Sequence, residues 1–420
     1  MARRLLGSSK MQKAPSAMVC DTSRLPALDL ARAMAVYGMM MINFKLIFHH
    51  DTGYFPLLTN LAAHLDGRAA AIFVVLAGIG VDRFSRKQTP AVSSGRNWRA
   101  VSVLTKRSVF LLVAGGLFTL TWPCDILHFY AILLFAGAWV SRLSIRAVLT
   151  IFLLLWFIFL GLMSTFDYDL LWKNTGMSLW EMKSLAIIAK HYFFHGTYPL
   201  IPWLIFFIAG IGIGKRLFVV LNRSRRLILF GLITVGLAES AAFLLIKFNV
   251  AHYFSAFAGS AAILNDTITN PALNWFVVRA FPPTPLFLVS GLGTAMVVIG
   301  CAQWAVSLRP MSSFIRALIN TGRISMTIYV GHIVLGINIM EWFGIDGDQH
   351  IVFVIEWASL AFLCWMLFAQ YLHRHSRKGP LEWLMRKTSE ISIARFHRRP
   401  AEAMPLKPVP VIVPFQGGHS

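Results

Sequence analysis

Charged residues are scarce in this chain of 420 residues. They make up 14% of the sequence, whereas a soluble globular domain carries about 25%, so the chain has too little polar surface for a soluble fold. The abundance of Phe, Leu and Ile excludes a disordered chain. Acids are scarcest, with 18 Asp+Glu against 39 Lys+Arg and a net charge of +21. These basic residues stand between long apolar runs and not on a folded polar surface, so we expect no nucleic-acid partner.

Cysteines are also few. Cys20, Cys124, Cys301 and Cys364 show no CxxC or metal-ligand spacing, so we expect neither a disulfide framework nor a bound metal. The N-terminus has basic residues but no cleavable apolar core before Leu25. The first span is therefore expected to act as an uncleaved signal anchor.

Long apolar runs are what the sequence has in abundance. A run of roughly 20 apolar residues suits a membrane-spanning helix, whereas an outer-membrane barrel would show short alternating segments. We therefore predict an all-α fold, a polytopic transmembrane helix bundle with about ten spans. The predicted spans are residues 27–48, 67–84, 108–123, 125–141, 146–165, 198–218, 227–247, 284–306, 324–343 and 351–372.

The basic residues predict how the bundle is oriented. With the N-terminus in the cytoplasm, the outer loops hold only Lys173, Lys183, Lys190 and Arg279, and most other basic residues fall on the inner side. This agrees with the positive-inside rule. We expect a bacterial-type inner membrane protein with both termini cytoplasmic.

The chain divides into three parts. We predict a cytoplasmic N-terminal arm at 1–24, a transmembrane domain at 25–372 and a basic cytoplasmic tail at 373–420. Within the tail, residues 381–396 are typical of an interfacial helix that rests in the lipid headgroups. The Pro-rich end is typical of disorder.

One short motif occurs twice, as Ala-Gly-Ile-Gly at 77–80 and at 209–212. Small residues allow two helices to approach closely. A parallel internal repeat is the alternative interpretation.

Ionisable residues inside the spans need an explanation, because an unpaired charge in a bilayer costs several kcal/mol. Asp29 and Arg32 share a helix face near the inner surface, either as a structural ion pair or as part of a site. Asp125 and His128 are also three apart, and pairing and site membership are equally open. Glu239 lies deep in its span, either protonated or paired with an unknown partner.

The first outer loop offers a general base. His64 and Asp66 stand just before the second span, and a carboxylate beside a histidine fixes the tautomer and supports the imidazolium. A solvated interfacial histidine is the alternative interpretation. His49 and His50 are further candidates in the same loop.

Two further segments contain candidate site residues: 198–203 has two prolines, and the ninth span has polar residues on one face. In 198–203 the prolines at 199 and 202 predict a stiff, kinked entry whose carbonyl groups line a cavity. Trp203 belongs either to this cavity or to the interfacial aromatic belt. Tyr329 and His332 share one face of the ninth span with Ser325.

Four stretches together resemble the heparan-α-glucosaminide N-acetyltransferase-like and YeiB-type membrane acyltransferases. Each motif alone is weak, but their order and spacing are fairly specific, and they spread over about three quarters of the chain. The stretches are 24–43 (Arg24-x4-Asp29-Leu-Ala-Arg32 to Asn43), 66–78 (Asp66-Gly-Arg), 126–130 with 198–214 (Ile126-Leu-His128-Phe-Tyr130, then Tyr198-Pro-Leu-Ile-Pro202-Trp203) and 322–332 (Gly322-Arg to Tyr329-Val-Gly331-His332).

The resemblance implies acyl transfer, typically from acetyl-CoA, to a hydroxyl or amino group of a sugar across the membrane. In the family, the catalytic histidine lies in the first outer loop a short way after the asparagine. This chain departs there, since His49, His50 and His64 all differ in spacing from Asn43. It also departs at Ala33, where the family usually has glycine.

The residue chemistry agrees with acyl transfer. Arginines at the inner face bind phosphates, a histidine serves as base or takes the acyl group itself, and Asn43, Tyr329 or His332 can donate to the oxyanion. We predict membrane lipid, acyl-CoA and a sugar or glycan acceptor as partners, and a homo-oligomer is possible. The predicted catalytic residues are His64, Asp66, His128, His332 and Asn43; the acetyl-CoA residues are Arg32, Arg83, Arg107 and Arg323; the substrate residues are Asp125, Tyr130, Tyr198, Trp203 and Tyr329.

A secondary transporter is the competing interpretation. The intramembrane histidines and carboxylates would then form a proton relay. Transporters often contain inverted repeats, and the sequence shows only the weak parallel echo.

Overall fold

The computed structural model describes residues 25–48, 55–88, 98–165, 184–190, 192–193, 198–216, 222–248, 275–308, 311–345, 347 and 349–390. These residues are helical, with no β-strand among them, so the all-α prediction is confirmed. The predicted arm 1–24, the end of the tail beyond Glu390, His49 and His50 lie outside the described residues. The helices are α1 (Pro26–Phe48), α2 (Pro56–Ala63), α3 (Arg68–Lys87), α4 (Trp98–Phe118), α5 (Leu127–Val140), α6 (Ile145–Thr165), α8 (Leu185–Lys190), α9 (Leu200–Lys215), α11 (Ser224–Lys247), α13 (Pro285–Ser307), α14 (Ser313–Gly322), α15 (Ser325–Trp342), α16 (Ile351–Arg374) and α17 (Pro380–Glu390).

Seven of the described helices are long and apolar enough to cross a membrane, or eight if α14 and α15, which meet at 80°, form one bent span. Two more, α5 and α9, are apolar but only 14 and 16 residues long. Every predicted span therefore contains a helix, and the chain is a membrane protein. The count of ten spans and the side on which the termini lie stay predictions.

The predicted third span, 108–123, is placed wrongly. Helix α4 begins at Trp98 and ends at Phe118. Lys106 and Arg107 lower the local hydropathy, but both are good helix formers, and their long apolar stems can lie along a membrane helix. A prediction based on mean hydropathy therefore leaves out the first turns of this helix. The short helices α2 and α14 were not predicted.

The two prolines of the predicted sixth span stand at the start of a helix. Pro199 is the N-cap of α9, and Pro202 lies in its first turn. A proline is tolerated there because the first backbone N–H groups of a helix have no intrahelical acceptor. The two prolines are therefore compatible with the first turn of α9.

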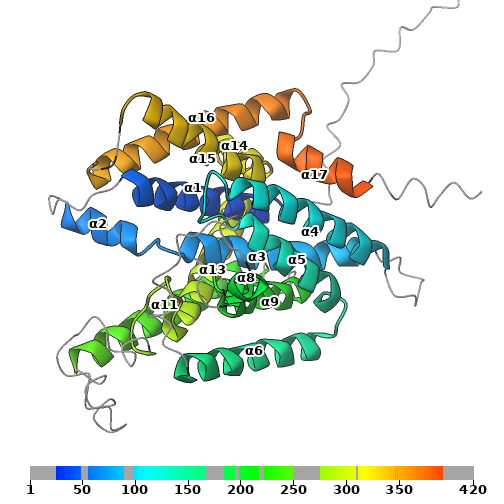
Figure 1. Cartoon of the computed structure of the whole chain (residues 1–420), viewed down its shortest axis with the longest axis vertical. Helices are drawn as coiled ribbons and strands as arrows, with labels where there is room; N and C mark the ends of the chain where they lie inside the picture. The colour runs from blue at the N-terminus through cyan, green and yellow to red at the C-terminus, as the bar shows by residue number, and fades with distance from the viewer. Residues whose placement is uncertain are drawn as a thin grey trace, which may run out of the picture.

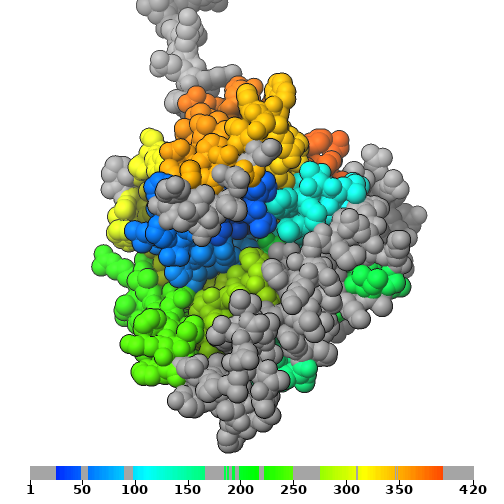
Figure 2. Space-filling view, turned by 60° about the vertical axis from the view of Figure 1, so that its left-hand side comes forward, coloured from blue at the N-terminus to red at the C-terminus, as the bar shows by residue number. Residues whose placement is uncertain are grey.

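Helices α1 and α3 lie at the centre of the bundle. Helix α1 packs against α3, α13, α14, α15 and α16. Figure 1 shows α14, α15 and α16 on one side of this centre and α9, α11 and α13 on the other, with α6 at the edge. On the face in Figure 2, the blue N-terminal helices meet the orange of the C-terminal ones, where α2 contacts α16.

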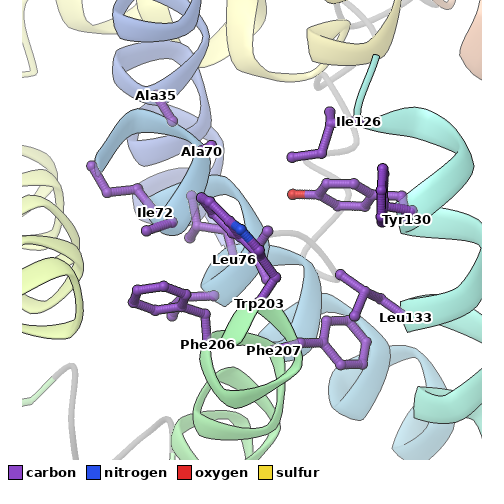
Figure 3. Close-up of a cluster of buried hydrophobic side chains, with 14 of the residues drawn as sticks. Ala35, Ala70, Ile72, Leu76, Ile126, Tyr130, Leu133, Trp203, Phe206 and Phe207 are labelled. Carbon is purple, nitrogen blue, oxygen red and sulfur yellow. The ribbon is translucent and has the colours of Figure 1, made fainter. Parts of the chain in front are cut away.

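The repeated Ala-Gly-Ile-Gly motif marks one helix crossing. A Cβ on Gly78 would overlap the carbonyl oxygen of Phe207, and a Cβ on Gly210 would overlap that of Val75. The two copies thus face each other where α3 crosses α9. Close approach of backbones replaces the hydrophobic effect as the source of stability between helices in lipid. Large side chains fill the space on either side of the crossing, among them Leu76, Phe206 and Phe207 (Figure 3).

Glu239 has a partner. The Arg68 guanidinium donates to its carboxylate, and the Ser290 hydroxyl donates to the same oxygen at 2.9 Å. Arg68 also donates to Ser290 at 3.0 Å and to the His64 carbonyl oxygen. This network joins α3, α11 and α13. It lies at the N-terminal end of α3, and Arg83 and Lys87 lie near the other end of that helix.

Replacing Glu239 by alanine is expected to lower the free energy of unfolding by about 1–2 kcal/mol, because Arg68 loses its counter-charge while a third of the Glu239 side chain is already exposed. Unfolding in detergent micelles measures the change. The double variant Arg68→Met/Glu239→Leu should recover most of the loss, since neither charge then remains. A double variant as unstable as Glu239→Ala would contradict this account.

Candidate active site

A cavity of about 640 Å³ runs into the bundle between α1, α3, α4, α5, α15 and α17. Six cationic side chains line it against two acids, Asp29 and Glu390. We call this arginine-rich end of the bundle the basic end. From Leu28 to Met39 the cavity follows α1 over 12 residues, which are separated by roughly 16 Å at 1.5 Å per step. The six cations are Arg32, Arg83, Lys87, Arg107, Arg323 and Arg386.

The structure brings all four arginines predicted for acetyl-CoA to this one cavity. Asp29, which is 3% exposed, helps to position two of them: it accepts from Arg32 at 2.6 Å and lies 3.7 Å from Nε of Arg323. Arg107 stacks over the Phe84 ring, with its guanidinium carbon 4.6 Å from the ring centroid. The Nε atoms of Arg107 and Arg323 are buried with no hydrogen-bond partner among the described residues. Their donors suit an anionic ligand.

The deep end of the cavity is aromatic. Phe73, Tyr130 and Tyr329 line it, and the Phe73 and Tyr130 rings are 5.9 Å apart in an edge contact. The Tyr130 hydroxyl is buried with no partner in the described part of the chain. Figure 3 shows this hydroxyl pointing away from α5 toward the centre of the bundle. A buried donor without an acceptor is costly, which marks this position for a ligand or a transition-state oxygen.

An aspartate–histidine pair lies directly behind this aromatic end. Nδ1 of His128 is 3.2 Å from Oδ2 of Asp125, and both side chains are almost completely buried. The same carboxylate accepts from the backbone N–H of Leu127 at 2.9 Å and from the Tyr329 hydroxyl at 3.2 Å. Asp125 stands just before α5, so its carboxylate also reaches the free N–H groups that begin the helix.

This pair has the geometry of a general base. A carboxylate only accepts, so in neutral imidazole Nδ1 of His128 carries the proton and Nε2 keeps its lone pair. Nε2 is buried and has no hydrogen-bond partner among the described residues. The contact between Asp125 and His128, one of the two interpretations that their spacing left open, is present in the structure. Ile126, Leu127 and Tyr329, which adjoin or bind the pair, all line the cavity.

His332 and Asn43 form a second polar pair, between α15 and α1. Nε2 of His332 is 3.0 Å from the Asn43 amide nitrogen, and Nδ1 is 3.1 Å from the Ile328 carbonyl oxygen. The carbonyl accepts from Nδ1, so Nε2 accepts from Asn43 and both ring nitrogens are satisfied. The His332 ring is 5.7 Å from that of Tyr329. This pair can hold Tyr329 in place, but it has no free nitrogen for proton transfer.

The predicted support of His64 by Asp66 is not what the structure shows. Both carboxylate oxygens of Asp66 accept from Lys45, each at 2.9 Å. His64 ends α2 with an exposed side chain, and Gly67 (φ +67°) turns the chain between the two residues and α3. Lys45 at the end of α1 is nearer the carboxylate in space, although it is more distant in sequence.

Three predicted substrate residues lie outside the cavity lining: Asp125, which contacts Tyr329, and Tyr198 and Trp203. Trp203 is 2% exposed and packs against Phe206 and Phe287, which also places it inside the bundle and not in an interfacial belt. Tyr198 packs against Trp203 and against Phe129, the neighbour of His128. These rings support the aromatic end from behind.

The sequence interpretation missed several cavity residues. Lys87 and Gln88 lie at the end of α3, where hydropathy gives no signal. Met385, Arg386 and Glu390 come from α17, which the sequence predicts as an interfacial helix. The sequence predicts that helix from its periodicity, but it does not indicate which part of the bundle the helix covers.

Residues 24–227 match the model described as heparan-alpha-glucosaminide N-acetyltransferase, catalytic, and residues 215–392 match a protein of unknown function model, DUF418. Together the two matches extend from residue 24 to residue 392 and support a heparan-alpha-glucosaminide N-acetyltransferase-like, YeiB-type family for this chain. No curated protein matches the chain.

Both matched regions contribute residues to the cavity. The first contributes α1, α3, α4 and α5, and it also holds the Asp125–His128 pair beside the cavity; the second contributes the end of α14, α15 and α17. The catalytic-domain match points to an acetyltransferase.

Proposed function

We propose that this protein is an acyl-CoA-dependent acyltransferase of a bacterial-type inner membrane. It moves an acyl group, most simply acetyl, from cytoplasmic acyl-CoA to a hydroxyl or amino group of an extracytoplasmic sugar or glycan. The observation that carries the proposal is the single cavity in which arginines at one end are joined to the aromatic end beside the Asp125–His128 pair. The catalytic-domain match supports the same reaction class.

The donor would lie along the cavity. Its phosphates would bind Arg32, Arg83, Arg107 and Arg323 at the basic end, where charge-assisted hydrogen bonds to phosphate are strong. The thioester arm would extend past Phe73 toward Tyr130. If the basic end is cytoplasmic, as the charge asymmetry predicts, the donor enters from the side on which it is made.

His128 would act as the base. Its Nε2 takes the proton from the acceptor hydroxyl or amine while the acceptor oxygen or nitrogen bonds to the acyl carbon. Asp125 supports the imidazolium that forms. The carbon–sulfur bond then breaks, and the proton passes from His128 to the departing thiolate of CoA.

Tyr130 would stabilise the transition state. Its hydroxyl lines the cavity without a partner among the described residues, so it can donate to the oxygen of the tetrahedral intermediate. Tyr329 is already committed to Asp125, and Asn43 and His332 to each other. Tyr329, Asn43 and His332 would therefore position the Asp125–His128 pair and the residues around it.

The test uses purified protein in proteoliposomes with radiolabelled acetyl-CoA and candidate sugars. Arg323→Gln should raise the KM for acetyl-CoA about tenfold or more, the equivalent of one charge-assisted hydrogen bond, and leave the acceptor KM unchanged. Arg323 is the best choice because Asp29 keeps its closer partner, Arg32. Arg226→Gln, an exposed arginine of α11 outside the cavity, is the matched control. If the protein does not bind CoA and the vesicles take up a solute, the protein is a transporter and the proposed enzyme activity is wrong.

A further inference from the structure

The helix α17 at the end of the described chain is fastened to the bend between α14 and α15. Oε1 of Glu382 accepts from the backbone N–H groups of Met326 and Thr327 at 2.8 and 3.1 Å, and Oε2 accepts from the Thr327 hydroxyl at 2.5 Å. The Thr327 hydroxyl in turn accepts from the backbone N–H of Leu381 at 3.2 Å. We call these contacts the Glu382 latch.

The latch caps a helix that has no cap of its own. The N-cap of α15, Ile324, makes no side-chain hydrogen bond, so its first N–H groups would lack acceptors. A carboxylate from 55 residues along the chain replaces the missing cap, and its negative charge suits a helix N-terminus. Burial raises the pKa of the Glu382 carboxyl. A buried carboxylate needs these three donors, so the contact specifies one position for α17.

The same face of α17 reaches the cavity. Glu382, Arg386 and Glu390 are spaced four apart and therefore lie in one row. Arg386 and Glu390 line the cavity together with Met385. The opposite face carries Leu384, which is 40% exposed. The hydrogen bonds between Glu382 and α15 therefore fix the rotation of α17 in which Arg386 faces the basic end.

Arg386 meets another cation there. Helix α17 packs against α4, and Arg107 of α4 lines the same cavity with Nε lacking a hydrogen-bond partner among the described residues. Two arginines from different helices that face one space form a natural site for a phosphate group.

We propose that α17 is part of the donor site: the Glu382 latch holds it across the basic end of the cavity, and Arg386 binds a phosphate of the donor together with Arg107. Glu382 is a positioning residue and Arg386 a binding residue. The identity of the ligand as acyl-CoA rests on the proposed function, whereas closure by the latch does not.

Closure is tested without any ligand. Ala77 of α3 lines the cavity, so Ala77→Cys, in a background with the four native cysteines replaced by alanine, reports access for an anionic methanethiosulfonate reagent. Glu382→Ala should speed labelling about tenfold or more, because several hydrogen bonds to a buried charged group are lost. Glu382→Gln keeps an acceptor for the α15 N–H groups and should label near the parent rate. Equal rates in all three would overturn closure by the latch.

The binding role is tested with two probes, CoA and pantetheine, which lacks the phosphates. Arg386→Gln should weaken CoA binding about tenfold and leave pantetheine binding unchanged, while Lys387→Gln, next along the helix and outside the cavity lining, should change neither. Unchanged CoA affinity in Arg386→Gln would overturn the phosphate role. Failure of the wild-type protein to bind CoA would overturn the proposed function and that role together, while the labelling rates would still decide closure.

Discussion

Replacing His128 by glutamine is expected to lower kcat for acyl transfer by about 10²–10⁴-fold, while CoA binding stays at the wild-type level. Glutamine fills similar space and can still donate to Asp125, but its amide cannot take a proton at neutral pH. The loss therefore falls on the chemical step, and the lining of the proposed donor cavity, which does not include His128, is unchanged. Single-turnover transfer and equilibrium CoA binding, measured on the same preparation, separate the two effects.

His64→Gln is the matched control for this variant. The same chemical change is made at an exposed histidine whose predicted carboxylate partner is bound to Lys45, so near-wild-type kcat is expected. The opposite pattern, with activity lost in His64→Gln and retained in His128→Gln, would place the base in the first outer loop. That result would restore the sequence interpretation and leave the Asp125–His128 pair a structural one.

The ionisable residues of the spans were accessible to sequence reasoning. Charge within an apolar run is costly, so Asp29, Arg32, Asp125 and His128 stand out without any structure. Their local partners were accessible as well, because residues three apart share a helix face. The Asp29–Arg32 pair forms as predicted, and the Asp125–His128 contact is one of the two outcomes that their spacing left open.

Partners distant in sequence were not accessible. Tyr329 reaches Asp125 across 204 positions, Asn43 reaches His332 across 289, and Arg68 reaches Glu239 across 171. Each contact depends on which helices pack together, and hydropathy carries no information about that. The error over Asp66 has the same origin, because proximity in sequence favoured His64 where the fold favours Lys45.

The crossing of α3 and α9 depends on close backbone contact at Gly210. Gly210→Ala is expected to lower the free energy of unfolding by about 3 kcal/mol, since overpacking a tight contact costs that much. Added to Gly210, a Cβ would overlap the Val75 carbonyl oxygen, and backbone cannot move aside as a flexible side chain can. The helices must separate, so unfolding in micelles by heat or denaturant should show the loss.

Gly236→Ala makes the same chemical change in α11, where nothing lies within 4 Å of the added Cβ. It should leave stability unchanged or raise it by up to about 1 kcal/mol, because alanine is the better helix former. Opposite signs for one substitution at two membrane helices would show that backbone contact, and not glycine as such, is the stabilising feature. Since Ala77 and Phe73 of α3 also line the cavity, separation of α3 from α9 in Gly210→Ala should weaken donor binding as well. Loss of stability with full donor affinity would show that the crossing and the cavity are mechanically independent.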